Sequence, residues 1–175
     1  NSIATNNKSG SFVIDVIHLQ EKLDSILTSS FQRYKALCAA LKSAFVHFLN
    51  LPKSATAEAI AKFTDKKLKG EKGVLEQDIE VLLDKAMIIF CYLNDKDVFE
   101  AFYKKYLSKR LLLGKSSSYE LEKAMISKLK TECGASFTSK LEGMFKDIEL
   151  SEECLKSFQA QQLQNHVETR RTELH

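Results

Sequence analysis

The chain has 175 residues, of which 44% are hydrophobic and 28% charged, so it is long enough to bury one substantial core. A single proline, six glycines and no tryptophan argue against a β-sandwich or barrel, which would need many turn residues. The net charge of +3 is too small to indicate nucleic-acid binding by itself. We therefore expect an all-α protein, either one domain or one domain with an appended helix.

The N-terminal part of the chain changes from polar to strongly periodic. Residues 1–11 are small and polar and lack periodicity, which predicts a disordered leader. Residues 12–54 contain two runs in which apolar side chains recur at spacings of three and four, as on one face of a helix. Pro52, the only proline, marks the turn after them. The next run, at 55–68, is shorter and less apolar, so we expect a helix too thin to be central.

The strongest helical pattern lies between residues 76 and 149. The segment 76–93 is apolar around most of its circumference, which predicts a buried helix. The segments 95–113, 117–133 and 137–149 each carry one apolar stripe. The connections between them are short, and short connections favour antiparallel neighbours. We therefore predict a helical bundle of four long helices, preceded by two or three further helices.

Turn and cap residues separate these predicted helices. Gly70 and Gly73 flank two charged residues and predict a mobile loop before the bundle. Ser117 followed by Glu120 has the form of a capping box, in which each side chain satisfies a free backbone N–H at a helix start. Gly134 predicts a bend or a break between the last two helices.

No pattern in the chain predicts catalysis. The four cysteines form no CxxC pair, so neither zinc binding nor redox chemistry is expected. Three of them fall in phase with helical apolar faces and should be buried: Cys38, Cys91 and Cys133. The four histidines belong to no metal-binding motif. Residues 114–116 read GKS, as in a phosphate-binding loop, but Lys109 stands where that motif needs its first glycine. We therefore assign no catalytic, cofactor-binding or metal-binding residue.

A basic cluster is the candidate interaction face, and its members are Lys104, Lys105, Lys109, Arg110 and Lys115. The cluster is compatible with the solvated side of an amphipathic helix, whose last-turn cations interact favourably with the helix dipole. It is also compatible with a contact surface for an acidic protein partner. A nucleic-acid surface is disfavoured, because the polar face carries no stacking aromatic. The apolar stripes beside it predict a structural core formed by Phe99, Phe102, Tyr103, Leu111, Leu129, Leu141 and Phe145.

Two long segments resemble a known family. They read FYKKYLSKRLLLGKSSS and ISKLKTECGASFTSKLEGMFKDIELS, and together they are similar to the signature region of the cullins, the scaffolds of RING-type ubiquitin ligases. The similarity extends upstream through DKKLKGEKGVLEQDIEVLLDKAMIIFCYLNDKDVFE. The shorter pieces FEAFYKK and GMFKDIELS most resemble the cullin subgroup that uses a damage-binding β-propeller adaptor.

The resemblance implies a domain organisation. Residues 12–54 would correspond to the end of the last cullin repeat and the transition helices, and 55–150 to the cullin helical bundle. Residues 151–175 would form an extra helix and a polar tail. After about Phe158 the tail departs from the strand-forming, YWP-containing continuation expected of a cullin.

The resemblance also implies a function. The chain would be a non-catalytic, rigid scaffold segment of a cullin-RING E3 ubiquitin-protein ligase, linking the substrate-receptor arm to the RING-binding region. Its partners would be other cullin regions, the RING-box subunit and the adaptor, whose main binding regions are not recognisable in this sequence. It would reside in cytoplasm and nucleus and need no cofactor. A membrane partner is not expected, because no apolar run approaches the roughly 20 residues of a membrane span.

The residues alone leave a second class of function open, a stand-alone helical interaction module that uses the basic cluster for acidic partners or nucleic acid. Such binding should weaken steeply with added salt, because it depends on the release of counterions. It should also weaken when Lys104, Lys105 and Lys109 are changed to glutamate. This behaviour would distinguish the module from a scaffold.

Overall fold

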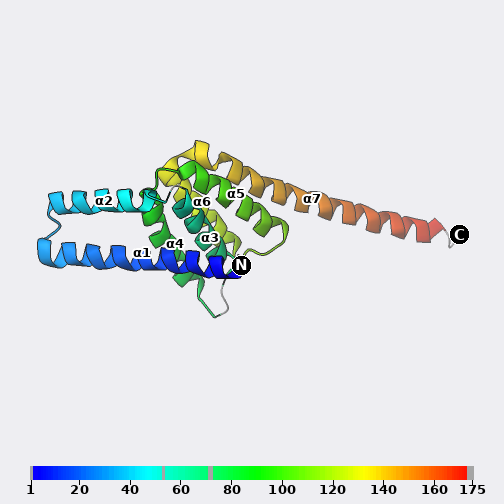
Figure 1. Ribbon diagram of the computed structural model, residues 1–175. Coiled ribbons are helices and arrows are strands. Elements are labelled where there is room, and N and C mark those ends of the chain that lie inside the picture. The colour runs from blue at the N-terminus through cyan, green and yellow to red at the C-terminus, as the bar shows by residue number, and fades with distance from the viewer. Residues whose placement is uncertain (1, 53, 71–72, 173–175) are drawn as a thin grey trace. The chain divides into compact units, whose positions relative to one another are not determined.

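The structure, a computed structural model, describes residues 2–52, 54–70 and 73–172, and within these ranges all regular structure is helical (Figure 1). The predicted all-α class is therefore confirmed. The chain divides into two compact units, Asn1–Thr138 and Ser139–His175. The helices are α1 (Ser2–Phe31), α2 (Lys35–Asn50), α3 (Ala55–Leu68), α4 (Glu76–Cys91), α5 (Lys96–Leu112), α6 (Tyr119–Cys133) and α7 (Ala135–Thr172).

Helix α3 lies at the centre of the first unit, contrary to the expectation that it would be too thin. It packs against α1, α4 and α5, and most of its side chains are buried. Many of them are small, such as Ala57 and Ala61, and this lets neighbouring helices approach from several sides. The prediction was wrong because it considered the size of one apolar face and not the number of faces that become covered.

Enlarging a small side chain on α3 should therefore destabilise the first unit. Ala61 is completely buried, and its replacement by leucine is expected to lower the free energy of unfolding by about 1–3 kcal/mol, because the surrounding core has no room for the added atoms. The same change at the exposed Ala101 is the matched control and should have an effect below about 0.5 kcal/mol. Urea denaturation of both variants measures the difference, and equal effects would contradict the central position of α3.

Helix α1 begins at Ser2, so residues 2–11 are helical and do not form the predicted disordered leader. Extending a helix costs little once its following turns are formed, and here those turns are held by packing against α3 and α4. Val13, Val16 and Ile17 are the buried contacts near this end. The boundary predicted between residues 54 and 55 also falls inside the first unit, because α1 and α3 pack together.

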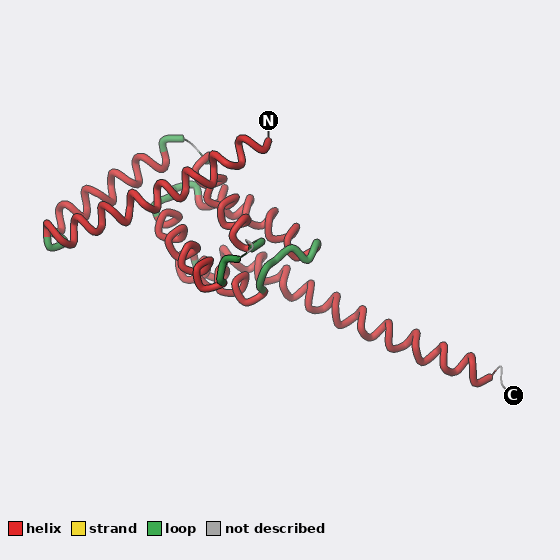
Figure 2. Tube along the Cα trace, turned by 90° about the horizontal axis from the view of Figure 1, so that it is seen from below, coloured by secondary structure: helices red, strands yellow, loops and turns green. Residues whose placement is uncertain are grey.

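Helices α1 and α2 run antiparallel, side by side (Figure 2). Asn50, at the end of α2, connects this hairpin to the turn between α4 and α5. Its amide donates to the Tyr92 carbonyl oxygen at 2.9 Å, and its side-chain oxygen accepts from the Asn94 backbone N–H at 2.8 Å. The backbone N–H of Ser54 donates to the Asp95 carboxylate at 3.2 Å. Two turns distant in sequence are thereby fixed to each other.

Helix α4 is less completely buried than its composition predicted. Ile79, Leu83 and Phe90 are buried in the core, whereas Val81 and Ile88 are 50% and 43% exposed. The exposed pair is seven residues apart and therefore lies on one side of the helix. The helix is thus covered by neighbours on part of its surface only.

The ends of α6 match one turn prediction and correct another. Gly134 has φ +87° and ends the helix, so the predicted break is confirmed. The N-cap residue is Ser118 and not Ser117, since the Ser118 hydroxyl accepts from the Leu121 backbone N–H at 3.4 Å. Part of the loop predicted between Gly70 and Gly73 lies outside the described residues.

In its described part, the second unit consists of residues 139–172 of helix α7. This helix continues through Thr172, so the predicted separation near residue 150 into a bundle helix and an extra helix is not observed. Side chains are described as far as Gln162, and Leu150, Leu155 and Phe158 are exposed. Among the described residues no helix is long and apolar enough to cross a membrane.

Candidate functional site: a buried ion-pair network beside exposed lysines

The five members of the predicted basic face do not share one surface. Lys104, Lys105, Lys109 and Lys115 are exposed, whereas Arg110 is completely buried. This corrects the prediction for Arg110. The physical reason is helical phase, since positions 99, 103, 107 and 110 are separated by four, four and three residues and fall on the core side of α5.

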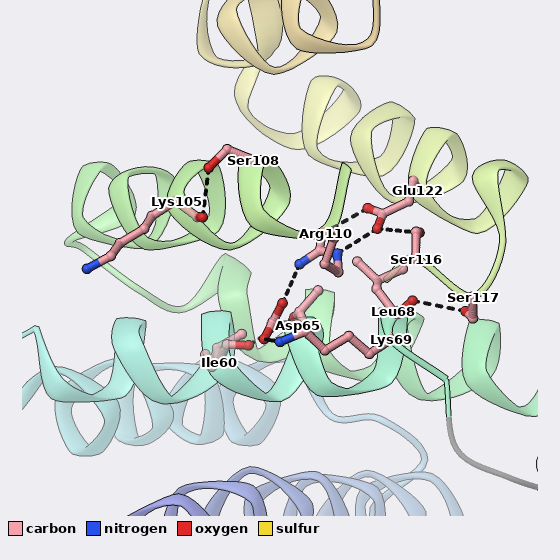
Figure 3. A network of polar contacts seen from close by, with 11 residues as sticks. Ile60, Asp65, Leu68, Lys69, Lys105, Ser108, Arg110, Ser116, Ser117 and Glu122 are labelled. Atoms are coloured by element: carbon pink, nitrogen blue, oxygen red, sulfur yellow. Dashed lines mark hydrogen bonds and ion pairs between the residues drawn. The ribbon is translucent and has the colours of Figure 1, made fainter. Parts of the chain in front are cut away.

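Arg110 is held by two carboxylates from two other helices (Figure 3). Its Nε and Nη2 donate to Glu122 Oε1 and Oε2, on α6, at 2.6 and 2.9 Å. Its Nη1 donates to Asp65 Oδ1, on α3, at 2.7 Å. The bidentate arrangement matches the planar guanidinium to the planar carboxylate, which makes such pairs strong and directional. One side chain therefore joins α3, α5 and α6.

Two further groups complete the network. Lys69 Nζ donates to Asp65 Oδ2 at 2.6 Å, and the Ser116 hydroxyl donates to Glu122 Oε1 at 2.7 Å. Two cations thus balance two carboxylates. Buried charges are tolerated when they are paired and hydrogen-bonded in this way. Each of the four carboxylate oxygens accepts at least one hydrogen bond, so the network is suited to holding the three helices together.

The pKa directions reflect the same surroundings. Burial alone would lower the pKa of Arg110, but the hydrogen bonds and charge of Glu122 and the other neighbouring groups outweigh it, and the pKa is raised. Arg110 therefore stays charged. The Tyr103 ring lies 5.6 Å from the Arg110 guanidinium carbon, and burial is the main reason that the pKa of Tyr103 is raised. Its hydroxyl is buried without a hydrogen-bond partner in the described part of the chain.

The loop between α5 and α6 is fixed to the end of α3. The backbone N–H and the hydroxyl of Ser117 both donate to the Leu68 carbonyl oxygen, each at 2.9 Å. Gly70 has φ +78°, and a Cβ at this position would lie 2.8 Å from Ser117 Cβ. A side chain at position 70 would therefore displace the loop. Ser117 thus holds the loop in place and does not form the predicted capping box with Glu120.

The predicted structural core separates into two groups. Phe99, Tyr103, Leu129, Leu141 and Phe145 are buried, with exposed fractions of 0%, 0%, 0%, 0% and 6%. Phe102 and Leu111 are only half-buried. Phe102 stacks on Tyr106 at 6.3 Å between ring centroids, and this pair lies at the edge of the core of α5. The expectation of full burial is therefore corrected for Phe102 and Leu111.

The cysteines are more accessible than predicted. Cys91 is exposed, and Cys38 and Cys133 are half-buried. No group of His, Cys, Asp and Glu side chains in the described ranges could hold a metal ion. The Cys91 thiol donates to Glu132 Oε2 at 3.2 Å. Partial burial, followed by this hydrogen bond, raises the pKa of Cys91 to about 11.

The raised pKa of Cys91 predicts slow alkylation at pH 8, where very little thiolate is present. Replacing Glu132 by glutamine removes the acceptor charge, lowers the pKa and should accelerate the reaction of Cys91 with iodoacetamide, as followed by mass spectrometry. Since the folded pKa is raised, the thiol contributes stability below the ordinary thiol pKa, and this contribution is lost as the pH rises through about 11. An unchanged rate in the Glu132→Gln variant would contradict this account.

The exposed lysines should contribute little to stability. Changing Lys104 or Lys105 to glutamine is expected to alter the free energy of unfolding by less than about 0.5 kcal/mol, because both side chains are exposed and have no hydrogen-bond or ion-pair partner among the described residues. Urea denaturation tests this directly. A larger loss would place these lysines in the structural network, as Arg110 is.

Sequence reasoning missed Asp65 and Glu122. A usable signal was present, because each is a charged residue in phase with apolar neighbours. Asp65 follows Ala61 by four residues, and Glu122 precedes Met125 by three. Charges of opposite sign on the core sides of different predicted helices indicate a buried ion pair.

The family model described as the Cullin alpha solenoid domain matches residues 1–155. The chain belongs to the cullin family. Its similarity to known cullins extends over most of the chain. Cullin-4 of Dictyostelium discoideum is 51% identical over 152 residues, or 86% of this chain. Cullin-4A of Homo sapiens is 47% identical over 163 residues, or 93% of the chain, and Cullin-3A of Arabidopsis thaliana is 48% identical over 148 residues, or 84%.

This cullin chain spans about a fifth of the length of these relatives, with shares of 19%, 21% and 20%. Asp65, Arg110 and Glu122 all lie inside the residues that the cullin family model matches. The buried ion-pair network is therefore part of the cullin-like region.

Proposed function

We propose that the chain is a non-catalytic, rigid scaffold segment of a cullin-RING E3 ubiquitin-protein ligase. The match to the cullin family carries this proposal, and the joining of α3, α5 and α6 by Arg110 supports it. A scaffold must hold its bound parts at a fixed separation. Helices locked by directional buried contacts do this better than a flexible tether, whose ends are spread over many distances.

The partners and location follow from this role. In the full-length protein the segment would connect the substrate-receptor arm to the RING-binding region, with the adaptor and RING-box subunit bound elsewhere. The proposed location is cytoplasm and nucleus. Within the segment, 12–54 is proposed as the end of the last cullin repeat and 55–150 as the helical bundle, whose last helix, α7, continues beyond residue 150.

We further propose that the chain belongs to the subgroup with a damage-binding β-propeller adaptor. The matches to Cullin-4 and Cullin-4A support this assignment, while the Cullin-3 relatives match at similar identity, 48% and 46%. The assignment is therefore tested by placing the chain in a Cullin-4A protein and in a Cullin-3 protein and comparing the activity of the two ligases.

A chimera tests the scaffold role. The matching 163-residue segment of human Cullin-4A is replaced by this chain's residues, and the reconstituted ligase is assayed for substrate ubiquitination. We expect activity close to that of the parent, and a strong loss when Arg110→Met is introduced into the chimera. The matched control is Lys109→Met, which removes an exposed cation from the adjacent position and should leave activity unchanged.

A chimera that binds its adaptor and RING subunit normally but does not transfer ubiquitin would overturn the proposal. Equal activity of the Arg110→Met and unmodified chimeras would show that the scaffold function does not require the buried ion-pair network. The same exchange made in a Cullin-3 background tests the subgroup, since better activity there than in Cullin-4A would contradict the assignment.

A further inference from the structure

The turn between α5 and α6 contains three consecutive serines whose hydroxyls have different partners. Ser116 donates to the buried Glu122 carboxylate, and Ser117 donates to the Leu68 carbonyl oxygen. Ser118 accepts from the backbone at the start of α6. Figure 3 shows Ser116 next to Glu122 of the ion-pair network and Ser117 next to Leu68.

Ser117 and Ser118 lie at helix ends of opposite dipole sign. Leu68 is the last residue of α3, so Ser117 contacts the negative end of that helix dipole. Ser118 is the N-cap of α6 and lies at the positive end of another helix dipole. A dianionic group is therefore unfavourable at Ser117 and favourable at Ser118.

Ser117 is also accessible. It is exposed, and the turn that leads to it, from Leu112 to Lys115, is exposed as well. Glu120, which is exposed, stands three residues after Ser117. An acidic side chain at this spacing is the feature that acidophilic serine kinases recognise.

We propose that Ser117 is a phosphorylation site and that its charging releases the α5–α6 turn from the end of α3. In the reaction the serine oxygen forms a bond to the γ-phosphorus of ATP, the bond from that phosphorus to the bridging oxygen breaks, and ADP leaves. The hydroxyl proton passes to the kinase or to water. The phosphorylated oxygen no longer donates to Leu68, and the new charge repels that carbonyl oxygen.

The effect would extend to the buried network. Space beside Ser117 is restricted on the side of Gly70, the second residue after α3, because a Cβ at position 70 would lie 2.8 Å from Ser117 Cβ. The phosphate must therefore move outwards and carry the turn with it. Ser116, the residue before Ser117, would then lose its position beside Glu122. This inference concerns the chain itself and does not depend on the proposed scaffold role.

The experiment has two parts. First, the full chain is incubated with ATP and an acidophilic serine kinase, and phosphorylated positions are mapped by mass spectrometry. We expect phosphate on Ser117, and much less of it in the Glu120→Gln variant. Second, chains that carry phosphoserine only at position 117 or only at 118 are compared by amide hydrogen exchange.

Phosphoserine at 117 should accelerate exchange of the residue 117 amide, which donates to Leu68, by roughly tenfold, the scale of one net hydrogen bond. Phosphoserine at 118 should not accelerate it, and Ser117→Ala, which loses the hydroxyl but adds no charge, should accelerate it less. The proposal is overturned if Ser117 is not modified, if phosphoserine at 118 loosens the turn equally, or if Ser117→Ala has the full effect.

Discussion

Replacing Arg110 by methionine is expected to lower the free energy of unfolding by about 3–5 kcal/mol, because the change leaves the buried carboxylates of Glu122 and Asp65 without their main partner. The long apolar side chain of methionine keeps most of the buried volume, so the loss measures electrostatics more than packing. Urea denaturation with a spectroscopic readout gives the value. Lys109→Met, one position earlier and exposed, is the matched control and should change stability by less than about 0.5 kcal/mol.

A second variant separates pairing from packing at the same place. When Arg110→Met is combined with Glu122→Leu and Asp65→Leu, no unpaired buried charge remains, and much of the lost stability should return. If the triple variant folds but its free energy of unfolding stays as low as that of Arg110→Met, the network contributes more than charge compensation. A small effect of Arg110→Met alone would show that the two carboxylates do not depend on it.

Phe99→Ala is expected to destabilise the chain by about 3–5 kcal/mol, because Phe99 is fully buried and its removal leaves a cavity. The ring contacts two other aromatics, Phe90 at 4.6 Å and Tyr103 at 5.6 Å between centroids, and these contacts would also be lost. The measurement is the urea midpoint together with the slope of the transition.

Phe102→Ala provides a control of the same residue type on the same helix. Phe102 is half-buried and contacts Tyr106 at the edge of the core, so its truncation should cost clearly less than that of Phe99. The sequence pattern assigned the two phenylalanines equally to the core, and only the structure distinguishes them. Equal losses in the two variants would contradict the observed difference in burial.

The existence and approximate limits of the helices were predictable because helical periodicity is local. The spacings of three and four that predicted segments 95–113 and 117–133 correspond to α5, Lys96–Leu112, and α6, Tyr119–Cys133. Gly134 likewise ended a helix as predicted, since its positive φ is a property of the residue and its immediate neighbours. The leader at residues 1–11 was misjudged because a polar helix end can be propagated from a well-packed neighbouring turn.

The residue type alone was misleading about the burial of Arg110. An arginine among lysines suggested an exposed charge, although its phase with Phe99, Tyr103 and Leu107 pointed to the core. Its partners lie 45 and 12 residues away in sequence, on α3 and α6. Whether an arginine at a core phase is buried depends on whether a carboxylate meets it there, and that is a property of the packed helices.

From the order of residues alone, the chain could be recognised as all-helical, as lacking a catalytic motif, and as resembling the cullins over its longest segments. The packed structure decided that α3 is central, that Arg110 is a buried connection between three helices, and that Ser117 is attached to the end of α3. The physical reason is the range of the interactions. Helical periodicity and turn chemistry act over a few residues, whereas burial and ion pairing depend on side chains brought together from distant parts of the chain.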